Sequence, residues 1–331
     1  MMIKESDNHA YKSPQISRQL PEPPQRISTA GQHPDLRGKH LVVTEKQGRL
    51  GNQLFLFAHL LAYARATGCT VINPSFWKYS HFFVGTHSDP LCRIPQVREA
   101  MLSRTLLRPA SRLSRQLVQC AKQLPVFKTW IKSIDASDRI VDLGGSEFEQ
   151  FFASADWLSL YGWCFRFYAG VEAHAEAVRS HFRPIEKHWR KVNQKLEVCR
   201  EGSDVCVGVH IRHGDFRDWH NGSFFRSVAQ FKRVMRHTRE LFLGQRVRFL
   251  VCSDERLSAS DFSDFDFQFG TGQIIEDLYS LVRCDYLIGP PESTFSGWAS
   301  FYGATPLFRI EDPNQRPDLD GFKIVQMSEE G

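Results

Sequence analysis

The sequence lacks the cysteine patterns of zinc-binding and disulfide-rich proteins. Its eight cysteines form no CxxC pair and no paired Cys/His spacing of the zinc type. Cys206, Cys252 and Cys284 stand inside apolar segments, where a thiol usually behaves as a small hydrophobic group. We therefore expect reduced, structural thiols and an intracellular compartment.

Long apolar runs are also missing. No stretch approaches the roughly 18 consecutive apolar residues of a membrane span, and the N-terminal residues show no apolar core of a signal peptide. The 331 residues are 42% hydrophobic and 24% charged, which is typical of a soluble globular protein with one large domain or two moderate ones. We expect a cytoplasmic protein.

The excess of positive charge is small. A formal net charge of +5 favours anionic ligands but lies far below that of a nucleic-acid binder, so we expect no nucleic-acid partner. Much of the basic character lies in residues 98–132, where Arg and Lys alternate with Leu and Val at helix-like spacing. This region is either a pair of surface helices with a solvated face, or a face for an anionic acceptor or for peripheral contact with the inner membrane.

The order of apolar and polar segments predicts two α/β halves with a cleft between them. Residues 1–37 are polar and proline-rich, which predicts a disordered or draped arm. Residues 38–200 open with a βαβ pattern, in which we expect Asn52 to cap a helix that begins near Gln53. In residues 201–331 strands alternate with helices, which predicts a parallel sheet covered on both faces.

Polar side chains follow three strands of the second half. "HIRHGD" (210–215) ends the first strand, Asp254 follows the next, and "PPESTFS" (290–296) follows the third. Ligands of open α/β sheets bind beyond such strand ends, and polar groups buried there without a ligand would lower stability. Ser293 or Thr294 can cap the next helix, whose free N–H groups favour phosphate, although a serine or threonine there is often only a cap.

Arg212 strengthens the phosphate interpretation. A fixed guanidinium at a neighbouring strand end can hold a diphosphate through two hydrogen bonds. Asp277 either accepts a hydrogen bond from a nucleotide base or is a favourable carboxylate in a first helical turn, and Asp254 is either a ligand or a turn residue. Asn52 and Gln53 could reach across the cleft to a sugar, although their turn "GRLGNQ" fits neither GxGxxG nor the P-loop.

Three stretches carry a family resemblance. "GRLGNQLFLFAHLLAYA", "VHIRHGD" and "DLYSLVRCDYLIGPPESTFSGWASFYG" are similar to motifs of the α1,2-fucosyltransferase family. More loosely, they resemble the fucosyltransferase superfamily that includes protein O-fucosyltransferases and α1,6-fucosyltransferases. The usual forms are close to G-G-L-G-N-Q-L-F, H-x-R-R-G-D-Y and N-S-T-F-S-W-W. The match runs in order from about residue 40 to 305, and its middle, roughly 75–200, has no counterpart among these motifs.

The resemblance implies a GT-B-like α/β fold of two Rossmann-like halves, GDP-fucose as donor, inversion at the anomeric carbon and no obligatory metal. It also implies a glycan or lipid-linked glycan acceptor in cell-surface polysaccharide or O-antigen synthesis, with a protein acceptor or another GDP-sugar as alternatives. Arg212 and the turn at 293–295 would hold the β-phosphate, and His210 and Asp277 would contact guanine or ribose. The residues expected to bind the donor are Asn52, Gln53, His210, Arg212, Asp254, Asp277, Ser293, Thr294 and Phe295.

Two positions depart from the family forms. The second arginine of the strand-end motif is His213 here, and the tandem tryptophan is Gly297–Trp298. His213 leaves one fewer permanent charge near the diphosphate, so the identity of the donor stays open. Because protein-directed relatives share the G-N-Q turn, the acceptor class stays open too.

The chemistry of sugar transfer assigns roles to the strand-end residues. The transition state is oxocarbenium-like, as in glycoside hydrolysis, and negative charge builds on the departing diphosphate. A fixed arginine and helix-terminal N–H groups stabilise that charge, so we expect Arg212 to be catalytic. Asp215 either deprotonates the acceptor hydroxyl or holds Arg212 or His213 in place, and Asp218 and His220 are further candidates for the base.

Two rival classes remain. A metal-dependent GT-A transferase is suggested by the DxD formed by Asp264 and Asp266 in "DFSDFDF", but no apolar strand precedes it, so we predict a loop. A non-catalytic nucleotide-sugar-binding or glycan-binding protein could keep the same fold. The presence of Arg212, Asn52 and the STF turn argues against it.

Overall fold

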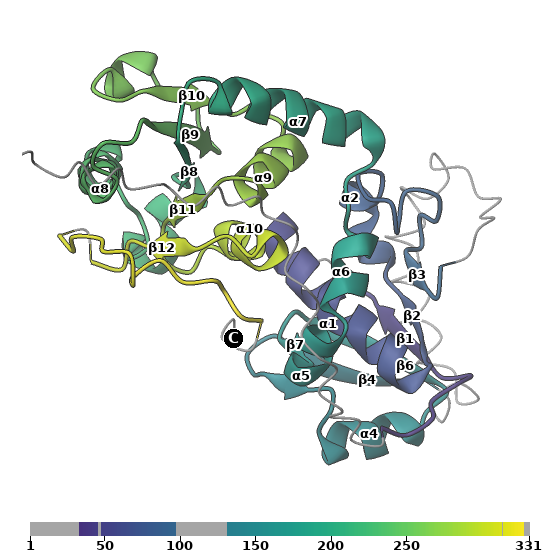
Figure 1. The fold of residues 1–331 in the computed structure, drawn as a ribbon. Coiled ribbons are helices and arrows are strands. Elements are labelled where there is room, and N and C mark those ends of the chain that lie inside the picture. The colour runs from purple at the N-terminus through teal and green to yellow at the C-terminus, as the bar shows by residue number, and fades with distance from the viewer. Residues whose placement is uncertain (1–32, 46–47, 97–130, 313, 328–331) are drawn as a thin grey trace, which may run out of the picture. The chain divides into compact units, whose positions relative to one another are not determined.

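The structure is a computed structural model that describes residues 33–45, 48–96, 131–312 and 314–327 (Figure 1). Its first part contains strands β1 (His40–Val43), β2 (Thr70–Ile72), β3 (Arg93–Ile94), β4 (Ile131–Ala136), β5 (Val141–Asp142), β6 (Trp157–Gly162) and β7 (Phe165–Arg166). The helices of this part are α1 (Leu50–Thr67), α2 (Trp77–Ser80), α4 (Ser146–Ala153), α5 (Tyr168–Ala173), α6 (Ala175–His181) and α7 (Glu186–Arg200).

The second part alternates strands and helices, as the sequence predicts. Its strands are β8 (Val205–Ile211), β9 (Val247–Ser253), β10 (Phe267–Phe269), β11 (Tyr286–Gly289) and β12 (Leu307–Arg309). Its helices are α8 (Val228–Leu241), α9 (Ile274–Val282) and α10 (Thr294–Gly303). The sequence did not predict the short strand β10, which directly follows the loop of the DxD.

The strands form two separate five-stranded sheets. The first has the order β3-β2-β1-β6-β4 and is parallel except for the pair β2/β3. The second has the order β10-β9-β8-β11-β12 and is parallel throughout. Strands β5 and β7 form a small sheet of their own. Because all strands of the second sheet run the same way, their carboxyl ends share one edge.

Strand β8 lies at the centre of the second sheet and is buried along its whole length. Helix α8 covers one face of the sheet, and helices α9 and α10 cover the other (Figure 1). Side chains of a strand alternate between the two faces. Val207 and Val209 therefore pack in the core that contains Phe231 of α8, while Cys206 joins the core that contains α9 and α10. His210 points to the same face of β8 as Cys206, toward α10.

Helix α1 packs against α10 of the second part as well as against α5 and α6. It begins at Leu50 with Arg49 as its N-cap residue, and no side chain caps it. The expectation that Asn52 caps a helix beginning near Gln53 is therefore wrong. The helix starts earlier because Gly48, with φ of +64°, turns the chain directly into it.

Two sequence predictions lie wholly or mostly outside the described residues. The expected arm is described only from residue 33 onward, where Leu36 is buried and its N–H donates to the carbonyl of Thr67 at 2.8 Å. Of the basic region 98–132, only residues 131 and 132 are described, and they belong to β4.

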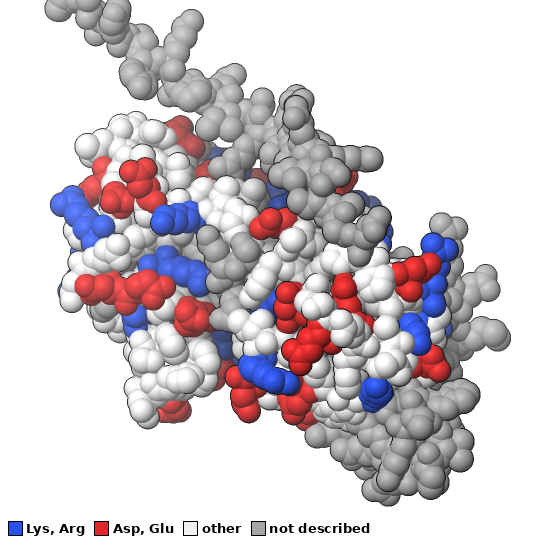
Figure 2. All heavy atoms as spheres, turned by 90° about the horizontal axis from the view of Figure 1, so that it is seen from below, with Lys and Arg blue, Asp and Glu red and all other residues white. Residues whose placement is uncertain are grey.

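One face of the described surface mixes both signs of charge. On the face drawn in Figure 2, basic and acidic side chains are interspersed, and neither sign covers a broad area of that face. Within the part of the chain that the structure describes, we find no helix with the length and apolar character needed to cross a bilayer.

Candidate active site

Strand β8 ends in a turn that holds Arg212 in a fixed position. Arg212 donates from Nε and Nη2 to the two carboxylate oxygens of Asp215, at 3.0 and 2.8 Å. Its guanidinium also lies over the ring of Phe216, 4.1 Å from the ring centre. A two-point ion pair and a stacked ring leave the group little freedom. Its third nitrogen, Nη1, makes no hydrogen bond within the described residues and is available to a ligand.

Asp215 has little capacity as a base in this arrangement. The hydrogen bonds from Arg212 lower the pKa of its carboxyl group, and the positive charges of Arg212 and Arg49 act in the same direction. A carboxylate with a lowered pKa accepts a proton less readily. Of the two roles that the sequence leaves open, the geometry favours the one in which Asp215 orients Arg212.

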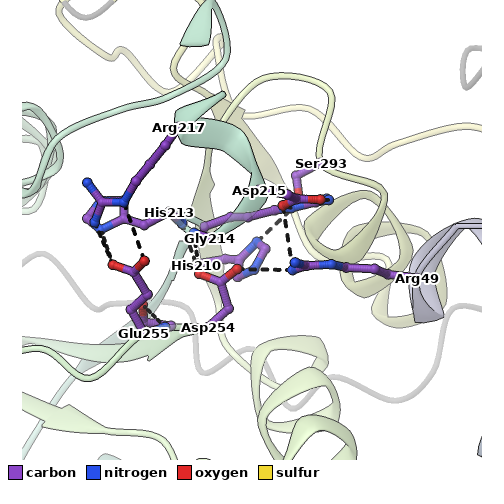
Figure 3. Close-up of polar contacts among 11 residues, drawn as sticks. Arg49, His210, His213, Gly214, Asp215, Arg217, Asp254, Glu255 and Ser293 are labelled. Atoms are coloured by element: carbon purple, nitrogen blue, oxygen red, sulfur yellow. Dashed lines mark hydrogen bonds and ion pairs between the residues drawn. The ribbon is translucent and has the colours of Figure 1, made fainter. Parts of the chain in front are cut away.

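Arg49 is a candidate site residue that the sequence analysis did not single out (Figure 3). Its Nη1 lies 3.1 Å from Oδ2 of Asp254 and 3.5 Å from Oδ1 of Asp215, so it reaches from the start of α1 to two strand ends of the second sheet. Its side chain is 54% exposed. The sequence feature that could have revealed it is the arginine in the turn "GRLGNQ", at a position where the family form has glycine. Helix α1 carries no acidic residue in its first turn, so its N-terminus adds partial positive charge.

Asp254 shapes the turn that carries Arg212. Its Oδ1 accepts hydrogen bonds from the backbone N–H groups of His213 at 2.9 Å and Gly214 at 3.4 Å. A Cβ atom on Gly214 would lie 2.7 Å from Oδ2 of Asp254, so a larger residue here would have to displace this carboxylate. Asp254 is thus more than a turn residue of its own strand, because it ties the end of β9 to the end of β8.

His213 points away from this cluster, although the family form has an arginine here. Its side chain is 5% exposed, and the centre of its ring lies 4.8 Å from that of Phe225. Its Nε2 lies 2.9 Å from the carbonyl oxygen of Arg226, and its Nδ1 lies 3.5 Å from a carboxylate oxygen of Glu255. Where the family form has a second arginine at the strand end, this chain therefore has a buried histidine that contacts Phe225, Arg226 and Glu255.

His210 connects β8 to the start of α10. Its Nδ1 lies 3.2 Å from Oγ of Ser293, and its ring lies 4.7 Å from that of Phe295. Burial, with a smaller contribution from the neighbouring charge of Arg212, lowers the pKa of His210 to about 3. The ring is therefore neutral at physiological pH. Ser293 is the N-cap of α10 and accepts from the N–H of Ser296, so its capping role is confirmed.

The N-termini of α1 and α10 meet at the glycine turn. Oγ1 of Thr294 donates to Oδ1 of Asn52 at 2.7 Å. A Cβ on Gly51 would lie 2.7 Å from the carbonyl carbon of Thr294, so glycine allows the two helices to touch. Gln53 is 3% exposed, and its Nε2 donates to the carbonyl of Gly48 at 3.0 Å. The structure thus places Asn52 at the junction and Gln53 behind it, where it supports the turn.

Gly51→Ala is expected to destabilise the protein. The added Cβ would stand 2.7 and 2.9 Å from backbone atoms of Thr294 and Phe295, which cannot yield as a flexible side chain does. We expect the free energy of unfolding to fall by about 1–3 kcal/mol in urea titrations, as for overpacked cores. Helix propensity alone would raise the stability by about 1 kcal/mol. A stability equal to or above that of the wild type would therefore show that α1 and α10 are not in contact.

A pocket of about 830 Å³ lies beside the carboxyl ends of β9 and β10. Its lining includes Ser253, Glu255 and Asp277. Asp277 accepts from the N–H groups of Thr271 at 2.6 Å and Gly272 at 3.1 Å, and burial raises the pKa of its carboxyl group. A volume of this size is sufficient for a nucleoside. The contact of Asp277 with a base stays a prediction, because its oxygens already hold the pocket wall.

The aspartates of the DxD lie in a loop, as predicted, and each pairs with a basic residue. Asp264 lies 3.4 Å from Nζ of Lys232, and Asp266 accepts from Nε of Arg248 at 2.8 Å. Within the described part of the chain, no group of three or more His, Cys, Asp or Glu side chains is arranged to hold a metal ion.

Most of the residues singled out from the sequence lie in one cluster at the carboxyl edge of the second sheet. The members joined by the contacts above are Asn52, His210, Arg212, Asp215, Asp254, Ser293, Thr294 and Phe295. Asp277 lines the neighbouring pocket, whereas Gln53 is buried behind the turn. Together with Arg49, which contacts Asp215 and Asp254, the cluster offers two guanidiniums and two helix N-termini to an anion.

The two halves with parallel sheets, joined at this edge, define a GT-B-like α/β fold, which confirms the fold class expected from the sequence. The structure is similar to that of a mutant of FUT1 from Arabidopsis thaliana in complex with GDP, with a TM-score of 0.54 and 15% identity. That similarity covers 86% of this chain and 73% of the other.

Fucosyltransferase NodZ from Bradyrhizobium is also similar, with a TM-score of 0.51, 17% identity and coverage of 84% of this chain and 97% of that one. NodZ α-1,6-fucosyltransferase co-crystallised with GDP gives a TM-score of 0.50 and 18% identity over 84% of this chain and 97% of that one. No family model matches the sequence, and neither does any curated protein. Similarity at these identities establishes the fold.

Proposed function

We propose that this chain is an inverting glycosyltransferase that transfers fucose from GDP-fucose to a hydroxyl group of a glycan. One observation carries the proposal. Arg49, Arg212 and the N-termini of α1 and α10 converge at the carboxyl edge of the second sheet. Guanidinium groups and helix-terminal N–H groups are the usual ligands of phosphate in proteins. The pocket beside Asp277 is positioned to take the nucleoside of the same donor.

The arrangement suits the charge that develops during sugar transfer. As the bond between the sugar and the diphosphate breaks, negative charge grows on the leaving oxygen. Nη1 of Arg212 is available to that oxygen, while Nε and Nη2 keep the group fixed on Asp215. Because this N–H group is held in place before the reaction, it does not have to move when the negative charge appears.

Arg49 can supply the second cation that His213 does not. Position 213 is buried against Phe225, whereas the side chain of Arg49 is half-exposed beside Asp215 and Asp254. A diphosphate carries more than one negative charge, and two guanidiniums neutralise it better than one. We therefore assign Arg49 and Arg212 together to the leaving group.

The role of Asp215 follows from its contacts. Both of its oxygens accept from Arg212, so we assign it to positioning. Another group must then accept the proton of the acceptor hydroxyl. Asp218 and His220 are exposed on the next turn and are the candidates for a base.

We propose that the reaction needs no obligatory metal. The two guanidiniums and the helix N-termini supply positive charge that a metal ion would otherwise bring to the diphosphate. The DxD aspartates, Asp264 and Asp266, are held by Lys232 and Arg248 in a loop before β10. This arrangement gives no support to a GT-A mechanism.

The finer assignments rest on the motifs. The resemblance to the α1,2-fucosyltransferase family supports transfer to a glycan or lipid-linked glycan in cell-surface polysaccharide or O-antigen synthesis. We assign residues 201–331 to the donor and residues 38–200 to the acceptor side. The basic region 98–132 would supply peripheral contact with the inner membrane on the cytoplasmic side.

Titration calorimetry with GDP, GMP and guanosine in EDTA tests the proposal. If the β-phosphate meets Arg49 and Arg212, GDP binds on the order of 10–100-fold more tightly than GMP, because a hydrogen bond to a charged group contributes about 1.5–3 kcal/mol. GMP and guanosine then differ less, since the pocket beside Asp277 binds mainly the nucleoside. Equal affinities for GDP and GMP would contradict the assignment of the two arginines.

Turnover separates a transferase from a binding protein. A panel of nucleotide sugars is screened first by thermal shift and then by release of the nucleotide in the presence of glycan acceptors. We expect GDP-fucose to raise the melting temperature and to release GDP, and UDP-sugars to do neither. Tight GDP binding without any release would favour a non-catalytic nucleotide-sugar-binding protein, and no GDP binding would reject both functions.

A further inference from the structure

The turn that follows Arg212 carries an aromatic cluster whose exposed ring, that of Trp219, has no role in the proposed donor site. Trp219 is 44% exposed, which is unusual for so large an apolar ring. Its ring is stacked on Phe216, with centres 5.3 Å apart and an angle of 23° between the planes. The ring centres of Phe224 and His220 lie 5.0 and 4.7 Å from that of Trp219. We call these four residues the Trp219 platform.

The platform is packed on one side and exposed on the other. Phe216 is fully buried and fixes the inner side of the indole. Two short 3₁₀ turns, Asp215–Arg217 and Trp219–Gly222, carry the residues. His220 and Asn221 both have positive φ, 47° and 56°, so the chain reverses immediately after Trp219. A ring held this way loses little conformational entropy when a ligand binds on it.

The platform adjoins the proposed leaving-group site. Phe216 contacts Trp219 and also lies under the guanidinium of Arg212, 4.1 Å from its ring centre. A single ring thus separates the exposed indole from the group assigned to the diphosphate. An acceptor hydroxyl must come within about 3–3.5 Å of the anomeric carbon for transfer. The acceptor therefore has to bind close to Arg212, which is where the platform stands.

The chemistry of the platform matches a sugar ring. A pyranose has an apolar face of C–H groups, which packs on an aromatic ring, and an edge of hydroxyl groups, which needs hydrogen-bond partners. Asp218 and Asn221 flank Trp219 and are exposed. Within the described residues, neither side chain makes a hydrogen bond or a close ion pair, so both can bind hydroxyl groups.

We propose that the Trp219 platform is an acceptor subsite that stacks one pyranose ring of the glycan. The proposal rests on the proposed function, because it names where the acceptor of that reaction binds. Asp218 and Asn221 orient the ring, and the indole covers its C–H face. An apolar side chain of a protein acceptor is the competing occupant, and it would be favoured over a pyranose if none of the sugar probes binds.

Saturation-transfer NMR on the GDP-loaded protein tests the subsite. The probes are the methyl pyranosides of β-galactose, β-glucose, β-N-acetylglucosamine and α-mannose. We expect transfer to the ring protons of at least one probe, and Trp219→Ala to weaken its affinity on the order of 3–10-fold, as for lost aromatic stacking. Trp157→Ala is the matched control, because Trp157 is 38% exposed but lies at the amino end of β6. It should leave probe binding unchanged.

Two further measurements keep the test decisive. Trp219→Phe should restore most of the binding, since it keeps an aromatic face, and urea unfolding should show that Trp219→Ala is folded. GDP calorimetry on the same samples separates the two proposals. If GDP binds and no probe binds, or if Trp219→Ala binds the probes as the wild type does, the subsite is rejected while the proposed function stands. If GDP does not bind, the proposed function itself fails.

Discussion

Arg212→Ala lowers turnover of GDP-fucose by about 10²–10³-fold, the effect expected when one donor to a developing negative charge is removed. The loss falls mainly on kcat, because the charge on the diphosphate is larger in the transition state than in the bound donor. The fold should persist, since Arg212 lies at a strand end and its partner Asp215 is 40% exposed. The measurement is the steady-state rate of GDP release, with urea unfolding in parallel.

Two control variants make this result specific. Arg212→Lys keeps a charge but loses the planar fork that binds Asp215 and a phosphate together, so its rate should lie between those of the wild type and Arg212→Ala. Arg246→Ala removes an arginine of the same sheet at the opposite edge, where it pairs with Asp204 on the surface. It should turn over normally. Near-normal turnover of Arg212→Ala would refute the assignment of the site.

The sequence was sufficient to predict four of the five strands of the second sheet, all except β10, and its polar edge. A strand is formed by consecutive residues, so its pattern can be seen in the sequence. Val205–Ile211 is a continuous apolar run because helices cover both faces of this strand. The polar groups that follow the run stand out against it. For the same reason His210 and Arg212 could be identified without knowledge of the three-dimensional neighbours.

The sequence could not predict which way side chains point or which distant residues join them. Arg49 and Asp254 are 205 positions apart, and no local pattern links them. Gln53 and His213 occupy motif positions, but both are buried, and a nitrogen of each side chain lies within hydrogen-bond distance of a backbone carbonyl oxygen. The start of α1 was misplaced because the positive φ of Gly48 and the contact of Gly51 with α10 determine it, and the second of these is a tertiary contact.

Acidification from pH 6.5 to 5 is expected to destabilise the protein strongly, because three histidine rings are held neutral: His59 and His210 are buried, and His181 is partly buried with its Nε2 inaccessible. Burial lowers the pKa of His59 to about 3, of His181 to about 4 and of His210 to about 3. The N–H of Phe167 donates to Nδ1 of His59 at 2.9 Å, so protonation of that nitrogen would break this bond. Nε2 of His181 is buried without a partner, so nothing nearby would compensate a charge there.

The direction of the effect follows from proton binding in the two states. Unfolded histidine has a pKa of about 6.5, so between that pH and the folded values the unfolded chain binds three more protons. Stability is therefore complete above about pH 6.5 and is lost as the pH falls. The slope is about 1.4 kcal/mol per pH unit for each histidine, or about 4 kcal/mol for the three. By pH 5 the loss is about 6 kcal/mol, within the range of the whole stability of a typical domain.

Urea unfolding at pH 8, 7, 6 and 5 measures this slope above the range in which most carboxylates titrate. Between pH 8 and 7 the free energy of unfolding should change little, and below pH 6.5 it should fall steeply. His181→Phe removes one titrating ring from its aromatic surroundings of Phe57 and Phe182, and should reduce the slope by about one third. A flat profile in the wild type, or an unchanged slope in His181→Phe, would mean that these histidines are not held as neutral rings in the folded protein.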